Sequence, residues 1–287
     1  MMASPTPLKE HQAALAELLA EFDRVCTALD IPYVLFAGTM LGAVRHSGFI
    51  PWDDDVDVLM LRRDYERLLR EADGVLNRDR FFLQKEFSEH WPMFFSKLRL
   101  NGTTCLETYH PKDTQSHFGV YMDIFPCDTA ANGRLKCKMQ YLASKAVIAQ
   151  SLYKRGYETN SVAKKLFMQA CRLLPTAWLR RVVENGDENG DRLHTFFAAA
   201  SSFEKNVYPR EWFAERITVP FEDGAYPVPA DYDRVLTHLY GNYRELPPLE
   251  QRRVKQHAVL VDLQKDYEYY REYHRHISFE VLTESIR

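Results

Sequence analysis

The sequence FAGTMLGAVRHSGFIPWDDDVDVLM spans residues 36–60 and joins a glycine turn to a dense cluster of aspartates. A strand-like run at residues 33–36 ends at Gly38 and Thr39, and a short helix is expected from there to about His46. Glycine lets backbone N–H groups approach an anion, and a helix N-terminus adds a favourable dipole. Gly38 and Thr39 are therefore predicted to contact phosphate oxygens.

The aspartate cluster occupies four of the five positions 53–57 and is flanked by apolar residues that favour burial. If residues 56–60 form a strand, Asp55 and Asp57 lie on one face of it. Such close carboxylates repel one another unless a positive charge lies among them, and they are the hard oxygen ligands that Mg²⁺ or Mn²⁺ prefers. The alternative is an acidic surface turn. The glycine turn facing the same space favours the metal site.

The composition of the 287-residue chain is that of a soluble globular protein, with 46% hydrophobic and 27% charged residues. Length alone allows one or two domains. No apolar run approaches the ~18 residues of a membrane span, and the N-terminus lacks a signal-peptide core. We therefore expect a cytoplasmic protein, with the inner face of the membrane as a further location. The five cysteines form no CxxC pair and are expected to be reduced thiols or buried apolar residues.

Positive charge is concentrated between residues 134 and 181, where eleven Lys or Arg residues accompany one acid, Glu158. Apolar residues at helical spacing predict two amphipathic helices here. Such helices suit peripheral contact with an anionic membrane or an anionic glycan. The alternative is that they cover the sheet and present a solvated basic face. Nucleic acid is an improbable partner, because the net charge is −3 and no basic and aromatic residues alternate.

A β-hairpin is predicted between residues 91–100 and 103–106, with its turn at Asn101 and Gly102. Lys97 and Arg99 are two residues apart in its first arm and so project from one face. Two cations on one strand face suit a diphosphate, which Arg can bind through two hydrogen bonds. Ordinary surface charges are the alternative.

The strand predicted at residues 118–126 carries one carboxylate, Asp123, among apolar and aromatic neighbours. A buried charge without a partner is costly. Asp123 is therefore expected either to form a salt bridge with a neighbouring Arg or to bind a metal ion.

Residues 38–58, GTMLGAVRHSGFIPWDDDVDV, resemble the signature of the LicD family, the fukutin-related phosphocholine transferases of the nucleotidyltransferase superfamily. Further similarities are the KLR strand at residues 97–99, DIFP at 123–126, FEDG at 221–224, YGNY at 240–243 and a later histidine, His257. The resemblance implies that Asp55, Asp57 and Asp123 are the catalytic and metal-binding carboxylates. It also implies substrate contacts from Gly38, Thr39, Arg45, Lys97 and Arg99. His257 is either a nucleotide contact or a surface histidine.

The fold that follows is α/β (α+β), with a nucleotidyltransferase-like mixed β-sheet core flanked by helices. We expect a catalytic core at residues 1–133, a basic helical region at 134–190 and a C-terminal region at 191–287. The turn-rich acidic loop at residues 185–191 marks the second boundary. The C-terminal region should complete the cleft with a hairpin at residues 217–229 and a helix that begins after Asp231.

The function implied by the resemblance is metal-dependent transfer of phosphocholine from CDP-choline to a hydroxyl group, with release of CMP. The acceptor would be a cell-surface glycan precursor, such as a lipid-linked teichoic acid, capsule or lipooligosaccharide unit. CDP-ribitol or CDP-glycerol is an alternative donor. A nucleotidyltransferase that releases pyrophosphate and a non-catalytic glycan-binding protein are alternatives from other classes. The general base is either Asp123 or one of Asp53 and Asp54. Trp52, Trp91 and Tyr109 would provide cation–π contacts for choline if the fold brings them together.

Overall fold

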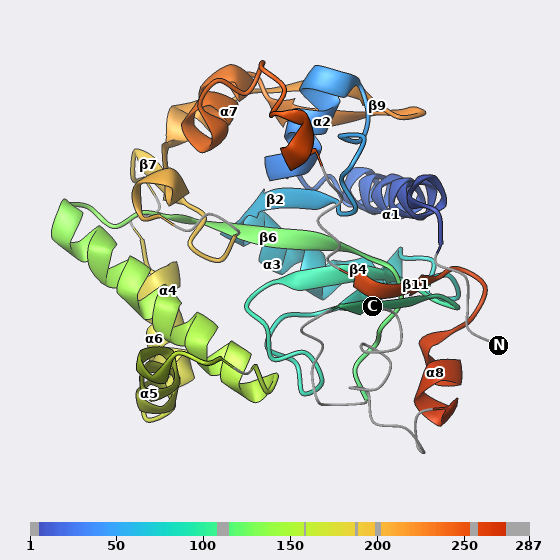
Figure 1. The fold of residues 1–287 in the computed structure, drawn as a ribbon. Coiled ribbons are helices and arrows are strands. Elements are labelled where there is room, and N and C mark those ends of the chain that lie inside the picture. Colours follow the sequence, from blue (N-terminus) through green and yellow to red (C-terminus); the bar gives the residue numbers. More distant parts are fainter. Residues whose placement is uncertain are drawn as a thin grey trace.

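The computed structural model describes residues 6–107, 115–157, 159–186, 189–198, 202–252 and 258–273. It is a mixed α/β structure in which a curled sheet is flanked by helices (Figure 1). The helices are α1 Leu8–Ala28, α2 Ala37–His46, α3 Arg62–Glu71, α4 Arg134–Lys154, α5 Val162–Cys171, α6 Thr176–Glu184, α7 Tyr232–Tyr240 and α8 Tyr267–Tyr273. The strands are β1 Val34–Leu35, β2 Asp57–Leu61, β3 Phe81–Gln84, β4 Ser96–Leu100, β5 Thr104–Glu107, β6 Tyr121–Thr129, β7 Arg192–His194, β8 Val207–Pro209, β9 Arg216–Phe221, β10 Gly224–Pro229 and β11 Ala258–Asp262.

The main sheet has the strand order β1-β2-β6-β4-β3, and its one parallel pair along this order is β2 with β6. The far end of β6 pairs with β7, which in turn pairs with β8. The expected mixed sheet is therefore present. Residues from the C-terminal third of the chain add strands to the sheet that the N-terminal part begins.

The hairpin predicted around Asn101 and Gly102 is wrong in its pairing. The chain does turn there, with Gly102 at φ 72°, but β5 pairs with β11 instead of β4. Both edges of β4 are already occupied, by β3 on one side and β6 on the other. The sequence correctly predicted the turn, but β5 pairs with β11, a strand far along the chain, and not with the neighbouring β4.

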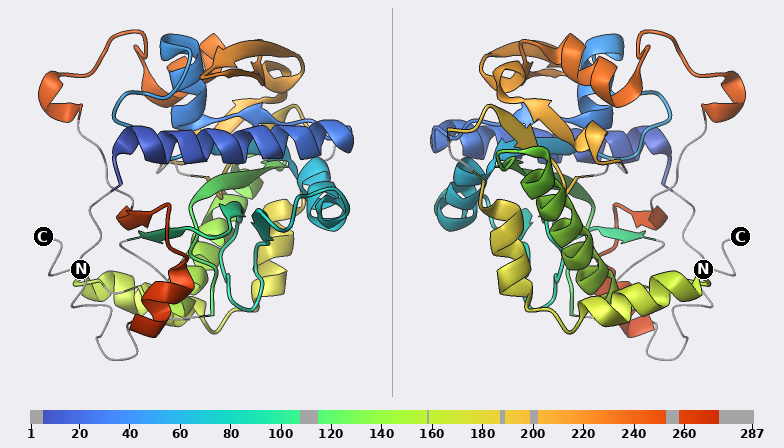
Figure 2. Two further views of the ribbon diagram at one scale, coloured as in Figure 1. Left: turned by 90° about the vertical axis from the view of Figure 1, so that its right-hand side faces the viewer. Right: turned by 90° about the vertical axis from the view of Figure 1, so that its left-hand side faces the viewer.

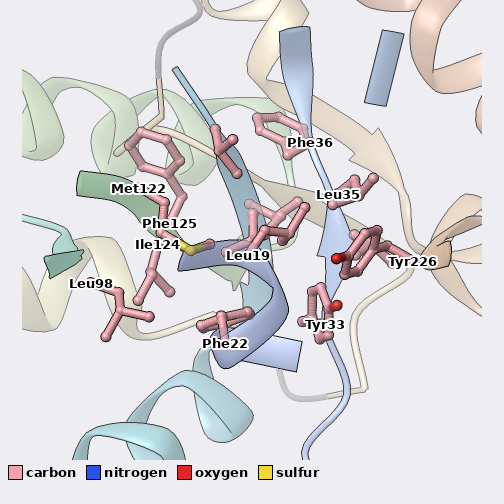
Figure 3. Close-up of a cluster of buried hydrophobic side chains, with 14 of the residues drawn as sticks. Leu19, Phe22, Tyr33, Leu35, Phe36, Leu98, Met122, Ile124, Phe125 and Tyr226 are labelled. Atoms are coloured by element: carbon pink, nitrogen blue, oxygen red, sulfur yellow. The ribbon is translucent and has the colours of Figure 1, made fainter. Parts of the chain in front are cut away.

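The core lies between the main sheet and α1, whose apolar residues recur at helical spacing and are buried. Leu19 and Phe22 from α1 meet Leu98 of β4 and Ile124 of β6 (Figure 3). All five cysteines are free and buried, as their pattern predicted.

Five other helices lie at two ends of the molecule. Helices α2 and α7 lie with the β9–β10 hairpin at one end, and α4, α5 and α6 lie together at the other (Figures 1 and 2). The C-terminal hairpin and the helix after Asp231 are confirmed, although the Asp231 side chain makes no capping hydrogen bond. Among the helices that the structure describes, none offers an apolar stretch of the length that a bilayer crossing requires. The division at residues 133 and 190 stays a prediction.

The buried histidine His194 makes folding stability depend on pH. Its ring is fully buried, stacks on Phe196 and places Nε2 3.1 Å from the carbonyl oxygen of Val183. Burial lowers the pKa of His194 to about 4, despite the opposing influence of the Asp128 charge. Between pH 6.5, the ordinary pKa of histidine, and about pH 4, His194 is protonated in the unfolded chain but neutral in the folded protein.

We expect wild type to lose stability as the pH falls from about 6.5 to about 4, and His194→Gln to lose roughly 2 kcal/mol less. Urea unfolding at pH 7 and pH 4.5 measures the difference. The control is His238→Gln, which removes a partly exposed histidine. Equal losses in wild type and His194→Gln would contradict the assignment.

Candidate active site

Three charged residues form one row across the centre of the main sheet. Asp57 of β2 is paired in register with Asp123 of β6, and Asp123 is paired in register with Lys97 of β4. Residues paired in this way project from the same face of a sheet. The strand register therefore brings together two aspartates predicted as metal ligands and a lysine predicted to bind substrate.

Lys97 is the cation that accompanies these carboxylates. Its Nζ atom lies 3.0 Å from Asp123 Oδ1 and 3.4 Å from Glu107 Oε1. The lysine side chain is only 1% exposed, so these ion pairs are shielded from water. Asp123 thus has the salt-bridge partner that its burial required, and the partner is a lysine from the neighbouring strand instead of the arginine considered from the sequence.

The carboxylates still carry more negative charge than Lys97 balances. Burial raises the pKa of Asp57 well above its usual range, and the charges of Asp55 and Asp123 raise it further. Burial also raises the pKa of Asp123, although Lys97 partly opposes this. A group whose pKa is raised in this way would be stabilised in its ionised form by an additional cation.

Asp55 is half-buried and lies two residues before β2, which begins one residue later than the strand predicted at residues 56–60. Its charge nevertheless raises the pKa of Asp57, which places it in the same electrostatic environment. Within the described residues, no three Asp, Glu, His or Cys side chains gather in an arrangement that could hold a metal ion. The row is therefore a set of neighbouring carboxylates, not a preformed cage.

The predicted glycine turn is the first turn of α2. Thr39 is buried, and its Oγ1 accepts a hydrogen bond of 2.8 Å from the backbone N–H of Asp57. Gly38 lies against Asp53, since a Cβ at position 38 would stand 2.8 Å from Asp53 Oδ2. A carboxylate thus lies at the helix N-terminus, where an anion is favoured. Thr39 anchors the start of the strand that carries Asp57.

Arg45 contacts the C-terminal region of the chain. Its Nη1 donates to the carbonyl oxygen of Tyr243 at 2.7 Å, and its Nε lies 3.0 Å from His46 Nε2. In these contacts Arg45 joins α2 to the segment that follows α7. Its predicted contact with substrate stays a prediction.

Arg99 shares a face of β4 with Lys97, as the two-residue spacing predicted, and is fully buried. It donates from Nε to Gln84 Oε1 at 2.6 Å and from Nη1 to the carbonyl oxygen of Gly119 at 2.8 Å. Its Nη2 finds no hydrogen-bond partner among the described residues. Nη2 of the Arg99 guanidinium group can therefore still donate a hydrogen bond.

Glu107 and Arg155 join the site without having been predicted. Glu107 Oε1 accepts a hydrogen bond of 2.9 Å from the Tyr121 hydroxyl, and Arg155 Nη2 lies 3.5 Å from Glu107 Oε2. Burial alone would raise the pKa of the Glu107 carboxyl, but Lys97, Arg155 and Arg99 hold it at about 2. Because these residues come from distant segments, no local sequence pattern identified them.

Tyr240 is a second unpredicted member, although the YGNY motif that contains it was recognised. It ends α7 and is 45% exposed. Partial burial raises the pKa of the Tyr240 hydroxyl, and the negative charges of Asp57, Asp53 and Asp55 raise it further. Helix α7 thus places a phenol near the carboxylates.

Glu222 of the FEDG turn fixes the loop between α2 and the aspartates. Its Oε1 accepts a hydrogen bond of 2.9 Å from the backbone N–H of Phe49, and its own N–H donates to the carbonyl oxygen of Ser47 at 3.0 Å. The hairpin of β9 and β10 therefore binds the loop that joins α2 to the aspartate cluster.

Trp91 and Trp52, two of the aromatic residues predicted to contact choline, lie in different environments. Trp91 is fully buried, and Lys97, Arg99 and Arg155 all lie within 5.4 Å of its ring centroid. Trp52 instead packs edge-on to His46 at 6.5 Å between ring centroids. Trp91 therefore already contacts the protein's own cations. Tyr109 and His257 lie outside the described residues.

Residues 30–143 match the family model described as LicD/FKTN/FKRP, nucleotidyltransferase domain. This part of the chain is therefore a LicD/FKTN/FKRP-type nucleotidyltransferase domain. The match contains the whole carboxylate row, from the aspartate cluster to Asp123, together with Lys97. The residues of α7 and the FEDG turn lie beyond it, so the C-terminal contacts with the LicD-family domain come from the structure.

Similarity to one relative extends along most of the chain. The lipopolysaccharide cholinephosphotransferase LicD of Haemophilus influenzae is 29% identical over 272 residues, which cover 86% of this chain and 94% of that protein. An uncharacterized protein of Rickettsia prowazekii is 41% identical over 51 residues, or 18% of this chain and 19% of that protein. A LicD-family enzyme, a transferase, is the class that these findings support.

Gly42 of α2 packs so closely against the loop that joins α2 to the aspartate cluster that a larger residue is expected to destabilise the protein. A Cβ there would lie 2.5 Å from the carbonyl oxygen of Gly48 and 3.2 Å from the backbone nitrogen of Ile50. We expect Gly42→Ala to destabilise the protein by roughly 1–3 kcal/mol, because backbone atoms must move to make room. The urea unfolding midpoint measures the effect.

The matched control is Gly74→Ala, since a Cβ at position 74 would meet nothing within 4 Å. It should leave stability nearly unchanged or slightly increased. A Gly42→Ala variant as stable as wild type would show that the loop does not pack on α2 as described.

Proposed function

We propose that this protein transfers a phosphoalcohol group, phosphocholine first among the candidates, from a CDP-alcohol to a hydroxyl of a surface glycan. Lipopolysaccharide is the acceptor class indicated by the name of the Haemophilus influenzae relative. The observation that supports the proposal most strongly is the row of Asp57, Asp123 and Lys97 within the family domain. It combines closely spaced carboxylates with a buried cation, which suits chemistry on a diphosphate.

The chemistry of the carboxylates fits a divalent metal ion. Asp55, Asp57 and Asp123 supply hard oxygen donors, and the raised pKa of Asp57 supports a site that favours additional positive charge. A three-carboxylate cage is not required, because Mg²⁺ is commonly bound by one or two carboxylates together with substrate phosphates. When bound, Mg²⁺ or Mn²⁺ would neutralise charge on the donor diphosphate.

The protein's own residues are assigned to positioning and charge balance. Lys97 and Arg99 provide positive charge behind the carboxylates, and Arg99 Nη2 retains an unused donor among the described residues. Gly38 and Thr39 are proposed to orient phosphate oxygens at the start of α2, where the helix dipole favours an anion. One aspartate accepts the proton of the attacking hydroxyl. Asp123 and the pair Asp53 and Asp54 are the alternatives for that role.

The proposal is tested by CMP release from CDP-choline with a lipopolysaccharide acceptor and Mg²⁺ or Mn²⁺. We expect metal-dependent turnover in wild type and a loss of at least about a hundredfold in Asp57→Asn and Asp123→Asn, because charge stabilisation at the reacting phosphate is removed. The control is Asp79→Asn, which removes an exposed carboxylate far from the row and should keep wild-type turnover.

The same assay with other donors separates the alternatives. Turnover with CDP-ribitol or CDP-glycerol alone would keep the phosphoalcohol transferase and change the alcohol. Release of pyrophosphate from CTP or ATP, without CMP release from any CDP-alcohol, would replace the proposal with a nucleotidyltransferase. Binding of a glycan without turnover of any donor would replace it with a binding protein.

A further inference from the structure

Helices α4, α5 and α6 and the loop after α5 expose large apolar side chains that the rest of the described structure leaves uncovered. Exposed fractions reach 76% for Leu135, 69% for Val162 and 86% for Leu173. The apolar members of this basic helical face are Leu135, Met139, Leu142, Tyr153, Val162, Leu166, Phe167, Leu173, Leu174 and Trp178.

The same face is strongly basic. Its exposed cations are Arg134, Lys136, Lys138, Lys154, Lys164, Lys165, Arg172 and Arg181. Glu158 is the one acidic residue in the sequence between residues 134 and 181. Apolar side chains and cations therefore alternate over a surface with almost no opposing charge.

Comparison with α1 shows that this exposure is not a general property of the helices. Both α1 and α4 contain 21 residues, yet Leu15, Leu18 and Leu19 of α1 are at most 1% exposed. On α4, Leu135, Met139 and Leu142 are spaced like a buried stripe and remain more than half exposed. A stripe of this kind leaves apolar area in water that a partner would cover favourably.

We propose that the basic helical face docks on a membrane surface that contains anionic lipids. Leu, Phe and Trp side chains can enter the interface between headgroups and acyl chains, while the surrounding Lys and Arg contact the anionic headgroups. Self-association through this face is disfavoured, because a second copy would set cations against cations. A charge-complementary partner that also accepts apolar side chains is a lipid surface of negative charge.

The docking face is connected to the candidate active site through α4. Arg155, the residue that directly follows α4, lies 3.5 Å from Glu107, and Glu107 lies 3.4 Å from Lys97. Figures 1 and 2 place α4, α5 and α6 together at one end of the molecule. Membrane docking would hold the carboxylate row close to that surface. The inference does not depend on which reaction the row performs.

Vesicle sedimentation tests the proposal with full-length protein and two vesicle types, phosphatidylcholine alone and phosphatidylcholine mixed with phosphatidylglycerol. We expect wild type to bind the mixed vesicles, to bind the neutral ones much more weakly, and to dissociate as salt increases. Lys164→Glu combined with Lys165→Glu should weaken binding to mixed vesicles at least about tenfold. Leu166→Glu combined with Leu173→Glu should weaken it by a similar factor, because the inserted apolar area is lost.

Matched controls change the same residue types elsewhere on the surface. Lys9→Glu combined with Arg78→Glu alters net charge equally at exposed positions, and Leu249→Glu alters a leucine that is 76% exposed. Both should bind mixed vesicles like wild type. Absence of wild-type binding, equal binding to neutral vesicles, or equal weakening by the controls would overturn the proposal. So would a dimer in sedimentation velocity that Leu166→Glu with Leu173→Glu converts to monomer, because the face would then join two copies.

Discussion

The ion pair between Lys97 and Asp123 is the interaction on which the arrangement of the sheet centre depends. Strand register places Asp123 between Asp57 and Lys97, so two carboxylates and one ammonium group share a buried row. Removing one partner from such a pair would leave an uncompensated buried charge, which typically costs about 3–5 kcal/mol. The lysine makes the row compatible with folding, and the remaining excess of negative charge makes it suited to a further cation.

The C-terminal third of the chain completes the environment of this row. Glu222 holds the loop that leads into the aspartate cluster, Arg45 binds the carbonyl of Tyr243, and Tyr240 lies near the carboxylates. The family domain at residues 30–143 supplies the charged groups, whereas later segments supply their support. Similarity to the Haemophilus influenzae cholinephosphotransferase extends over 86% of the chain, well beyond the aspartate motif.

Sequence patterns predicted features that depend on neighbouring residues, such as the β9–β10 hairpin, the helix that follows Asp231 and the shared face of Lys97 and Arg99. They also predicted that Asp123 needs a partner, because burial of a lone charge is costly wherever it occurs. They failed where distant segments compete, as in the pairing of β5 with β11 instead of β4. Glu107 and Arg155 were missed for the same reason, since only the fold brings them to Lys97.

The central claim is that the carboxylate row binds a divalent cation together with the diphosphate of a CDP-alcohol. Electron paramagnetic resonance of free Mn²⁺, titrated with the protein in the presence and absence of CDP-choline, tests it directly. The account predicts that CDP-choline strengthens Mn²⁺ binding to wild type, because its phosphates add oxygen ligands, and that Asp57→Asn abolishes this gain. Binding of Mn²⁺ that is unaffected by CDP-choline and by Asp57→Asn would contradict it.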